Sequence, residues 1–235
     1  MAHSIQVNIR RFALSALFLL SLGNLSVQGQ RPVYHGSKHY SIKVKEFKQE
    51  GKLPSNVIVM YGDSHSEYGG DWNRHFPGAV KIINRGIIGD DSQGMYNRLD
   101  LVLPYHPKKI FFECGANDLS HGWTVERVFQ GITRVLATIR ERSPKTELYV
   151  QSVLPLNEEV GTWKYLKGKD DLIIQLNNKL KEYCASHALT YIDLYTPLLG
   201  AHPKTMKAEY CRDGLHLTEK GYDVWAKIIR PYIYK

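Results

Sequence analysis

Several features are scarce in this chain of 235 residues, and each shortage excludes a class of protein. Three Cys are too few for a fold built on disulfide bonds, and their odd number leaves at least one unpaired in a monomer. Nineteen Gly and ten Pro are too few for a collagen-like or low-complexity chain. Beyond residue 30 no apolar run reaches the ~18 residues of a membrane-spanning helix. An ordinary globular domain remains.

The first 30 residues differ from the rest of the chain. A stretch without acidic residues ends in Arg10 and Arg11, and residues 12–22 are then apolar apart from two Ser. Small residues follow up to Gly29, which is typical of a secretory signal peptide. We therefore expect residues 1–29 to be a signal peptide, residues 30–235 to form a single domain, and the mature protein to be secreted or periplasmic. An uncleaved anchor helix is the alternative.

The chain is basic, with 31 Lys and Arg against 23 Asp and Glu and a formal net charge of +8. An exported domain has little access to nucleic acid, so we interpret the excess charge as solvated surface and expect no nucleic-acid partner. We also expect no membrane span once the signal peptide is removed. The oligomeric state stays open.

Five short apolar runs, rich in β-branched and aromatic residues, predict buried parallel strands. Helical periods separate them, and the strongest places apolar residues at i, i+3, i+4 and i+7 over residues 125–139. A further helix is expected around residues 40–47, before the first strand. Because strands and helices alternate, we predict an open parallel sheet with helices on both faces. The five runs are residues 57–60, 80–83, 110–112, 148–150 and 191–194.

The ends of these strands are where a parallel sheet carries its active site. The sequence GDSH at residues 62–65 follows the first run. A Ser on a tight turn from strand to helix, as Ser64 would be, is typical of a nucleophile, because the turn exposes the hydroxyl at the helix N-terminus. The alternative is that Ser64 merely caps the helix.

Two further turns follow the second and third runs. Gly86 allows a close backbone approach to a ligand and offers its N–H to an anion. Asn117, in the sequence GAND at residues 115–118, can donate its side-chain amide to a developing oxyanion. Taken singly, a plain turn explains each of them better.

The last turn contains an acid and a His three positions apart, Asp213 and His216. An Asp at this spacing can accept a hydrogen bond from the imidazole Nδ1–H and leave Nε2 free as a base. Asp193, within the last predicted strand, is the alternative acid, and Asp213 is preferred for its spacing.

Taken together, and in this order along the chain, the four turns resemble the SGNH, or GDSL-type, hydrolase and esterase family. The sequences NRGI at residues 84–87 and DGLHLT at residues 213–218 are similar to its bacterial branch of acetylhydrolase-like and carbohydrate O-acetyl esterases. The resemblance implies a three-layer α/β/α sandwich with a five-stranded, flavodoxin-like parallel sheet.

The resemblance also implies a chemistry. Ser64, His216 and Asp213 would form a catalytic triad with an acyl-enzyme on Ser64. The Ser64 N–H, the Gly86 N–H and the Asn117 amide would form the oxyanion hole. No metal and no cofactor are expected, and the substrate would be a small-molecule or glycan ester with an acetyl or other short acyl group. A lipid acylhydrolase is the alternative enzyme, and a glycan-binding relative without turnover is the alternative outside enzymes.

A few positions keep two interpretations. His65 stands where many relatives carry an aliphatic residue, and it either borders the pocket or packs under it. His121 and Trp123 either line the substrate site or do not, whereas Trp72 and His75 are assigned to packing and surface. Among the cysteines, Cys114 is expected as a buried thiol. Cys184 and Cys211 either form a disulfide in an oxidising compartment or stay reduced.

Overall fold

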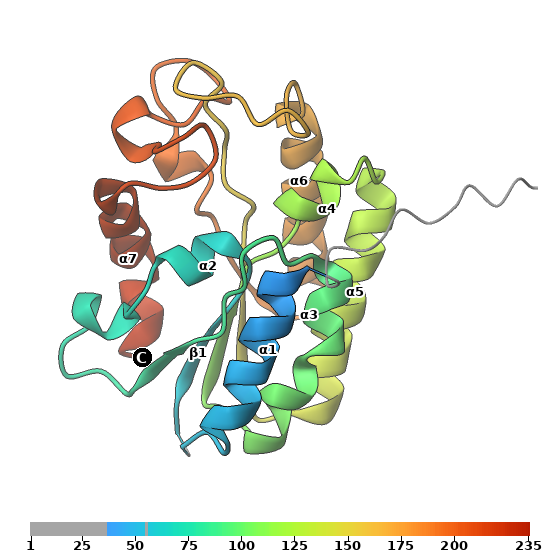
Figure 1. Cartoon of the computed structure of the whole chain (residues 1–235), viewed down its shortest axis with the longest axis vertical. Coiled ribbons are helices and arrows are strands. Elements are labelled where there is room, and N and C mark those ends of the chain that lie inside the picture. The colour runs from blue at the N-terminus through green and yellow to red at the C-terminus, as the bar shows by residue number, and fades with distance from the viewer. Residues whose placement is uncertain (1–36, 55) are drawn as a thin grey trace, which may run out of the picture. The chain divides into compact units, whose positions relative to one another are not determined.

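The computed structural model describes residues 37–54 and 56–235, and the expected signal peptide, residues 1–29, lies outside them. The described residues form one parallel sheet of five strands: β1 (Ile58–Tyr61), β2 (Ile82–Asn84), β3 (Lys109–Phe112), β4 (Glu147–Gln151) and β5 (Thr190–Ile192). The strand order is β2-β1-β3-β4-β5, which confirms the predicted flavodoxin-like arrangement (Figure 1). All five carboxyl ends therefore lie at one edge.

Helices cover both faces of the sheet. They are α1 (Lys38–Glu50), α2 (Ser64–Tyr68), α3 (Ser92–Asn97), α4 (Ala116–Ser120), α5 (Val125–Arg142), α6 (Asp170–Ser186) and α7 (Glu219–Ile233). Short 3₁₀ turns lie at Trp72–His75, Leu99–Leu101, Leu103–Tyr105, Thr196–Leu198 and Ala208–Tyr210. Helices α3, α5 and α6 pack on one face and α7 packs on the other (Figure 1). The helix expected around residues 40–47 is α1, whose Tyr40 and Phe47 are buried against Ile87.

The strands are buried on both faces, and this is why their sequences are continuous apolar runs. In β1, Val59 and Tyr61 enter the core under α3, α5 and α6. Ile58 and Met60 point the other way and enter the core under α7, where Trp72 is also buried. The alternation follows from the two-residue period of a strand. Trp72 is thus a packing residue, as predicted.

Helix α5 carries the strongest sequence pattern of the chain. Thr124 caps its N-terminus by accepting a hydrogen bond of 3.3 Å from the backbone N–H of Arg127. Val128, Ile132 and Leu136, spaced four residues apart on one stripe, are completely buried against the sheet. Each such side chain contributes roughly 1.5–3 kcal/mol by leaving water, so packing rather than helix propensity holds α5 in place.

The bounds of all five strands differ from the predicted runs by one or two residues, and two of these differences matter for the site. Strand β2 begins at Ile82 rather than two residues earlier, because the Asn73 side chain hydrogen-bonds both the N–H and the carbonyl of Ile82 at 2.9 Å. Strand β5 ends at Ile192, so Asp193 lies beyond the strand and not within it. Its carboxylate accepts a hydrogen bond of 3.0 Å from the N–H of Thr196 and begins a 3₁₀ turn.

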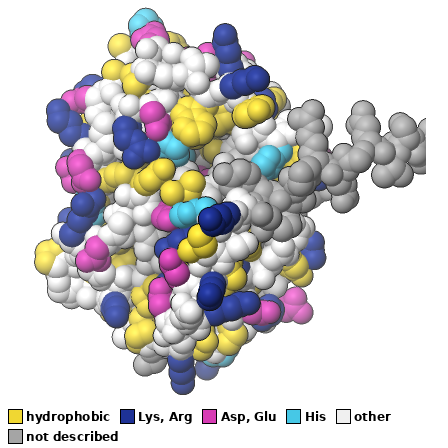
Figure 2. Space-filling view, viewed as in Figure 1, with side chains coloured by type: hydrophobic (Ala, Val, Ile, Leu, Met, Phe, Trp, Pro, Cys, Tyr) yellow, Lys and Arg dark blue, Asp and Glu magenta, His cyan; other side chains and the backbone are white. Residues whose placement is uncertain are grey.

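The surface mixes charges of both signs. On the face shown in Figure 2, Lys and Arg side chains are interspersed with Asp and Glu rather than gathered in one basic area. Among residues 37–54 and 56–235, the helices are all too short or too polar to cross a membrane.

The three cysteines are free and buried. Cys184, on α6, belongs to the core on one face of the sheet, whereas Cys211 belongs to the core on the face under α7. The sheet therefore lies between them, and of the two alternatives the structure supports reduced thiols over a disulfide. Burial raises the pKa of the Cys184 thiol to about 11, and burial together with the charge of Asp118 raises that of Cys114, so neither forms a reactive thiolate at neutral pH.

We expect three free thiols per chain. The protein, unfolded under non-reducing conditions and treated with a chromogenic thiol reagent, should give a thiol count equal to the full number of Cys. All three thiols are free and buried, and Cys184 and Cys211 lie on opposite faces of the sheet. The same count after reduction is the control. A single free thiol before reduction would contradict this arrangement.

Candidate active site

The turn after β1 places Ser64 at the start of α2. Asp63 caps this helix, and its side chain accepts a hydrogen bond of 3.0 Å from the N–H of His65. Ser64 is therefore not the cap, which removes the simplest alternative for its presence. Its N–H belongs to the first turn of α2, where a helix leaves backbone donors without an intrahelical acceptor. The side chain is 4% exposed.

The structure brings Ser64, His216 and Asp213 together. The Nε2 atom of His216 lies 3.0 Å from the Ser64 Oγ, and Nδ1 lies 2.9 Å from the Asp213 Oδ2. A carboxylate accepts hydrogen bonds, so Nδ1 carries the proton and Nε2 presents a lone pair to the Ser64 hydroxyl. Asp193, the alternative acid, is engaged with Thr196 instead.

The electrostatics of the site keep Asp213 ionised and His216 neutral. Burial raises the pKa of Asp213, but the backbone and side-chain hydrogen bonds from His216 outweigh burial and hold this pKa well below its usual value. Burial, followed by the positive charge of His65, lowers the pKa of His216, although the bond to Asp213 acts against both. The imidazole is thus a free base at neutral pH.

The loop that carries Asp213 and His216 interlocks with the loop between β4 and α6. Gly214 has a φ of +95°, and a Cβ there would lie 1.8 Å from the carbonyl oxygen of Gly161. The Gly214 carbonyl accepts a 2.9 Å hydrogen bond from the N–H of Asn157, and the Asp213 carbonyl accepts one of 3.1 Å from the Trp163 indole. This second loop was missed in the sequence, where it carries no recognisable motif.

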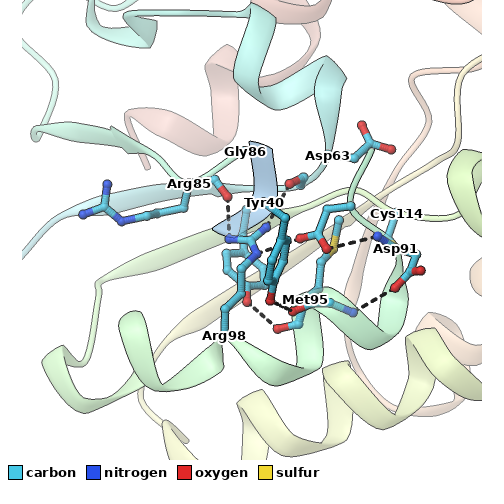
Figure 3. Close-up of polar contacts among 12 residues, drawn as sticks. Tyr40, Asp63, Arg85, Gly86, Asp91, Met95, Arg98 and Cys114 are labelled. Atoms are coloured by element: carbon cyan, nitrogen blue, oxygen red, sulfur yellow. Dashed lines mark hydrogen bonds and ion pairs between the residues drawn. The ribbon is translucent and has the colours of Figure 1, made fainter. Parts of the chain in front are cut away.

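Arg98 joins the turns after β1 and β2 (Figure 3). Its guanidinium is buried and donates to the Arg85 carbonyl at 2.7 Å and to the Gly62 carbonyl at 3.0 Å. The third side of the guanidinium donates to the Asp90 carboxylate at 2.7 Å. The turn before Ser64 and the turn before Gly86 therefore share one rigid anchor. No pattern in the sequence indicated this role for Arg98.

Gly86 lies beside α2, but its backbone meets protein rather than open space. A Cβ at Gly86 would lie 2.2 Å from the backbone nitrogen of Glu67, so only glycine allows this contact. Its N–H donates to the Asn84 side chain at 2.8 Å. The close backbone approach predicted for a ligand is thus made by α2, and the N–H reaches an oxyanion only by leaving Asn84.

Asn117 occupies the predicted position at the end of β3, at the start of α4. Its amide nitrogen donates one hydrogen bond of 3.0 Å to the Asp63 carboxylate and another of 3.0 Å to the Asp90 carbonyl. Both amide hydrogens are engaged, so a substrate would have to displace one of these acceptors. In the described structure Asn117 holds the turns of β1 and β2 together.

Two aromatic rings cover the imidazole of His216. The Tyr68 ring, from the end of α2, and the Trp163 ring, from the loop before α6, each meet it edge to face at centroid distances of 4.9 and 5.1 Å. His216 is only 4% exposed, whereas Tyr68 and Trp163 are 40% and 42% exposed. The guanidinium of Arg212 stacks on Tyr68 at 4.4 Å. We call Tyr68, Trp163 and the stacked Arg212 the aromatic rim of the site.

Other expected residues take lesser places. His121 and Trp123 pack against each other, with their ring centroids 5.2 Å apart. The Nε2 atom of His121 lies 3.3 Å from the buried carboxylate of Asp91, so its ring faces Asp91 in the described structure. One group of described residues, Asp63, His65 and Glu113, brings three potential metal-ligating atoms within 4.8 Å of one another.

Comparisons with known proteins give relatives of this chain and of its fold. The human platelet-activating factor acetylhydrolase IB subunit alpha1 is 26% identical over 181 residues, which cover 75% of this chain and 74% of the human protein. A Streptococcus pneumonia structure whose description names platelet activating factor has a TM-score of 0.75 and 24% identity, over 84% of this chain and 94% of the other. A GDSL-like lipase from Bacteroides thetaiotaomicron has a TM-score of 0.70 and 22% identity, over 83% and 96%.

The two solved structures have the same fold as this chain, whereas the family is identified by a sequence profile. The profile described as "GDSL-like Lipase/Acylhydrolase family" matches residues 54–224, a span that includes Ser64, Gly86, Asn117, Asp213 and His216. The chain therefore belongs to the GDSL-like lipase/acylhydrolase family of ester hydrolases.

Proposed function

We propose that this protein is a serine esterase that removes acetyl or other short acyl groups from a carbohydrate. The observation that carries the proposal is the chain of contacts from Asp213 through His216 to the Ser64 hydroxyl, at 2.9 and 3.0 Å. Nucleophile, base and orienting acid are each within hydrogen-bond reach of the next, as nucleophilic catalysis requires.

In this mechanism the Ser64 Oγ attacks the ester carbonyl carbon while Nε2 of His216 takes the hydroxyl proton. The carbonyl π electrons move to oxygen, and they return when the bond to the alcohol oxygen breaks. His216 gives its proton to that oxygen. The alcohol then leaves, and the acyl group stays on Ser64. His216 then takes a proton from water as the water oxygen attacks the acyl carbon. The bond from that carbon to the Ser64 Oγ breaks, the acid leaves, and His216 returns the proton to Ser64.

The oxyanion needs donors at the point where the charge develops. The Ser64 N–H, in the first turn of α2, is the donor that requires least rearrangement. The Gly86 N–H and the Asn117 amide join it by releasing their present acceptors, which are Asn84 for Gly86 and Asp63 or Asp90 for Asn117. Such hydrogen bonds often reach their final geometry only when substrate is bound.

The aromatic rim supports a carbohydrate as the alcohol part. Since His216 returns its proton to the leaving oxygen, the alcohol must lie beside His216, where Tyr68 and Trp163 expose their rings. An aromatic ring offers a flat apolar surface with a polar edge, which matches the apolar face and hydroxyl rim of a pyranose. Arg212 adds hydrogen-bond donors at the same place.

A lipid ester is the second candidate, and one observation favours it. The human relative at 26% identity is named a platelet-activating factor acetylhydrolase, and the matching family is described as lipases and acylhydrolases. The two candidates share a short acyl group and differ in the alcohol. We further propose that the protein is exported, which rests on the sequence of residues 1–29 alone.

Substitution of Ser64 by alanine should abolish ester hydrolysis. Loss of the nucleophile removes the acyl-enzyme route, and a rate loss of about 10⁴-fold or more is expected. The measurement is kcat/KM on p-nitrophenyl acetate, with circular dichroism to verify the fold. A folded Ser64→Ala protein with near-normal turnover would refute the serine mechanism.

The value of kcat/KM for ester hydrolysis should fall as the pH is lowered. The apparent pKa of this fall should lie below the ordinary histidine value of 6.5, because burial and the charge of His65 lower the pKa of His216. The base form of His216 is active, so kcat/KM rises through this pKa as pH increases and is flat near neutrality. The pH profile of kcat/KM on p-nitrophenyl acetate measures it. A rate still rising steeply above about pH 7.5 would contradict the assignment.

Substitution of Trp163 by alanine should separate the two parts of the substrate. We expect kcat/KM on an acetylated methyl glycoside to fall roughly tenfold, since a lost contact of about 1.4 kcal/mol is tenfold. The rate on ethyl acetate, whose alcohol is too small to reach the ring, should change less than about threefold.

Tyr165→Ala is the matched control, because Tyr165 lies on the same loop and is 64% exposed. Trp163→Phe keeps a ring but loses the N–H that holds the Asp213 carbonyl. An equal loss on both esters with Trp163→Ala would mean that Trp163 only supports the loop. Efficient hydrolysis of an acetylated phospholipid and none of the glycoside would favour the second candidate.

A further inference from the structure

A buried group of titratable side chains lies directly beneath the nucleophile turn, and the mechanism above does not use it. Asp63, His65 and Glu113 come from the β1–α2 turn and from the end of β3, and each is at most 1% exposed. Ionisable side chains are seldom so completely buried unless they are paired. We name these three residues the buried cluster.

His65 connects the two segments that form the site. It follows Ser64 in the chain, and its Nε2 lies 3.1 Å from the carbonyl oxygen of Leu215, the residue before His216. A carbonyl only accepts, so Nε2 carries a proton and donates it. One imidazole ring thus fixes the distance between the helix that carries the nucleophile and the loop that carries the base.

The other nitrogen of His65 faces two carboxyl groups. Nδ1 lies 3.4 Å from the Asp63 Oδ1 and 3.8 Å from the Glu113 Oε2. Burial lowers the pKa of His65, but the contact with Asp63 and the charge of Glu113 outweigh burial and raise this pKa to about 9. Both ring nitrogens are therefore protonated at neutral pH, and Nδ1 has no lone pair for a metal ion.

The charges within the buried cluster balance. Burial, followed by the charge of Asp63, raises the pKa of Glu113 well above its usual value, so Glu113 is neutral. Burial raises the pKa of Asp63, but the contact with the His65 ring, its charge and the hydrogen bond from the His65 backbone N–H outweigh burial and lower it, so Asp63 is ionised. One anion, one cation and one neutral acid leave the cluster without net charge, which lowers the cost of burying these groups.

The cation of the cluster lies beside the base. The ring centroids of His65 and His216 are 5.5 Å apart. Four other titratable or charged groups face His216. Two of them lie on its own loop: Asp213, which binds the imidazole, and Arg212, which binds the Asp213 carboxylate. The other two, Asp63 and Tyr68, come from the turn after β1 and from α2. Of these groups, His65 is the one whose positive charge lowers the pKa of His216.

We propose that His65 is a positioning residue for His216: its Nε2–H holds the Leu215 carbonyl, and its positive charge, balanced by Asp63 beneath it, keeps the neighbouring imidazole in the base form. The inference rests on the proposed function of Ser64 and His216. It gives a role to His65, the residue that directly follows the nucleophile in the chain.

Two variants separate the hydrogen bond from the charge. His65→Gln keeps a donor for the Leu215 carbonyl and loses the charge. Its acid limb of kcat/KM on p-nitrophenyl acetate should move to higher pH by roughly 0.5–2 units, the range given by Coulomb's law near 5.5 Å with effective dielectric constants of about 80 to 20. Its plateau above about pH 8 should stay within roughly threefold of the unsubstituted enzyme.

The double variant His65→Leu/Glu113→Leu removes the donor and the charge together. Glu113 is replaced as well, because it would otherwise lose the imidazole that it faces. Asp63 keeps its hydrogen bonds from the backbone N–H of residue 65 and from the Asn117 amide. The acid limb should move in the same direction, and the plateau should also fall, by roughly tenfold or more, because Leu215 is no longer held. His187→Gln, at an exposed His on the far end of α6, is the control and should leave the profile unchanged.

An acid limb that stays in place in folded His65→Gln and in the folded double variant would overturn the proposal. So would one equivalent of bound metal in the purified protein, because Nδ1 would then be a ligand and not an acid. Failure of the proposed function looks different, since Ser64→Ala would then remain active or the unsubstituted enzyme would hydrolyse no ester at all.

Discussion

The guanidinium of Arg98 is the anchor on which the geometry of the site depends. It binds the Gly62 and Arg85 carbonyls and so fixes two turns, from neighbouring strands, against each other. Asn117 adds the turn after β3 through Asp63 and the Asp90 carbonyl. Parallel strands bring these turns to one edge of the sheet, but strand pairing alone leaves their ends free to move. Buried charge-assisted hydrogen bonds remove that freedom and give Ser64 a fixed position.

The parts that were predictable from the sequence are those that short-range patterns determine. Continuous apolar runs indicated strands buried on both faces, and the four-residue spacing from Val128 to Leu136 indicated α5. The residues after each strand could be placed at one edge because all strands of the sheet are parallel. The three-residue spacing of Asp213 and His216 identified a pair that meets at 2.9 Å.

The rest depends on contacts between distant segments, which leave no periodic signal. Arg98 binds two backbone carbonyls, so the residue types at those two positions give no sign of the contact. Trp163 lies on a loop without a motif. The oxyanion role of the Gly86 N–H stays a prediction, and the sequence did not indicate that the missing side chain of Gly86 makes room for the backbone of α2. The sequence left the role of His65 open, because the acid it faces, Glu113, follows β3 and lies 48 positions away in the chain.

The two halves of the site differ in how they are supported. Ser64 lies on the short turn that directly follows strand β1 of the sheet. His216 instead belongs to a loop that another loop holds through Gly214, Gly161 and Asn157. Segments fixed mainly by loop contacts open at a lower free-energy cost than the strands beneath them. Gentle heating should therefore separate base from nucleophile while the sheet stays intact, so reversible loss of activity precedes global unfolding. Adaptation of such an enzyme to heat would begin at the interlocked loops and leave the core unchanged.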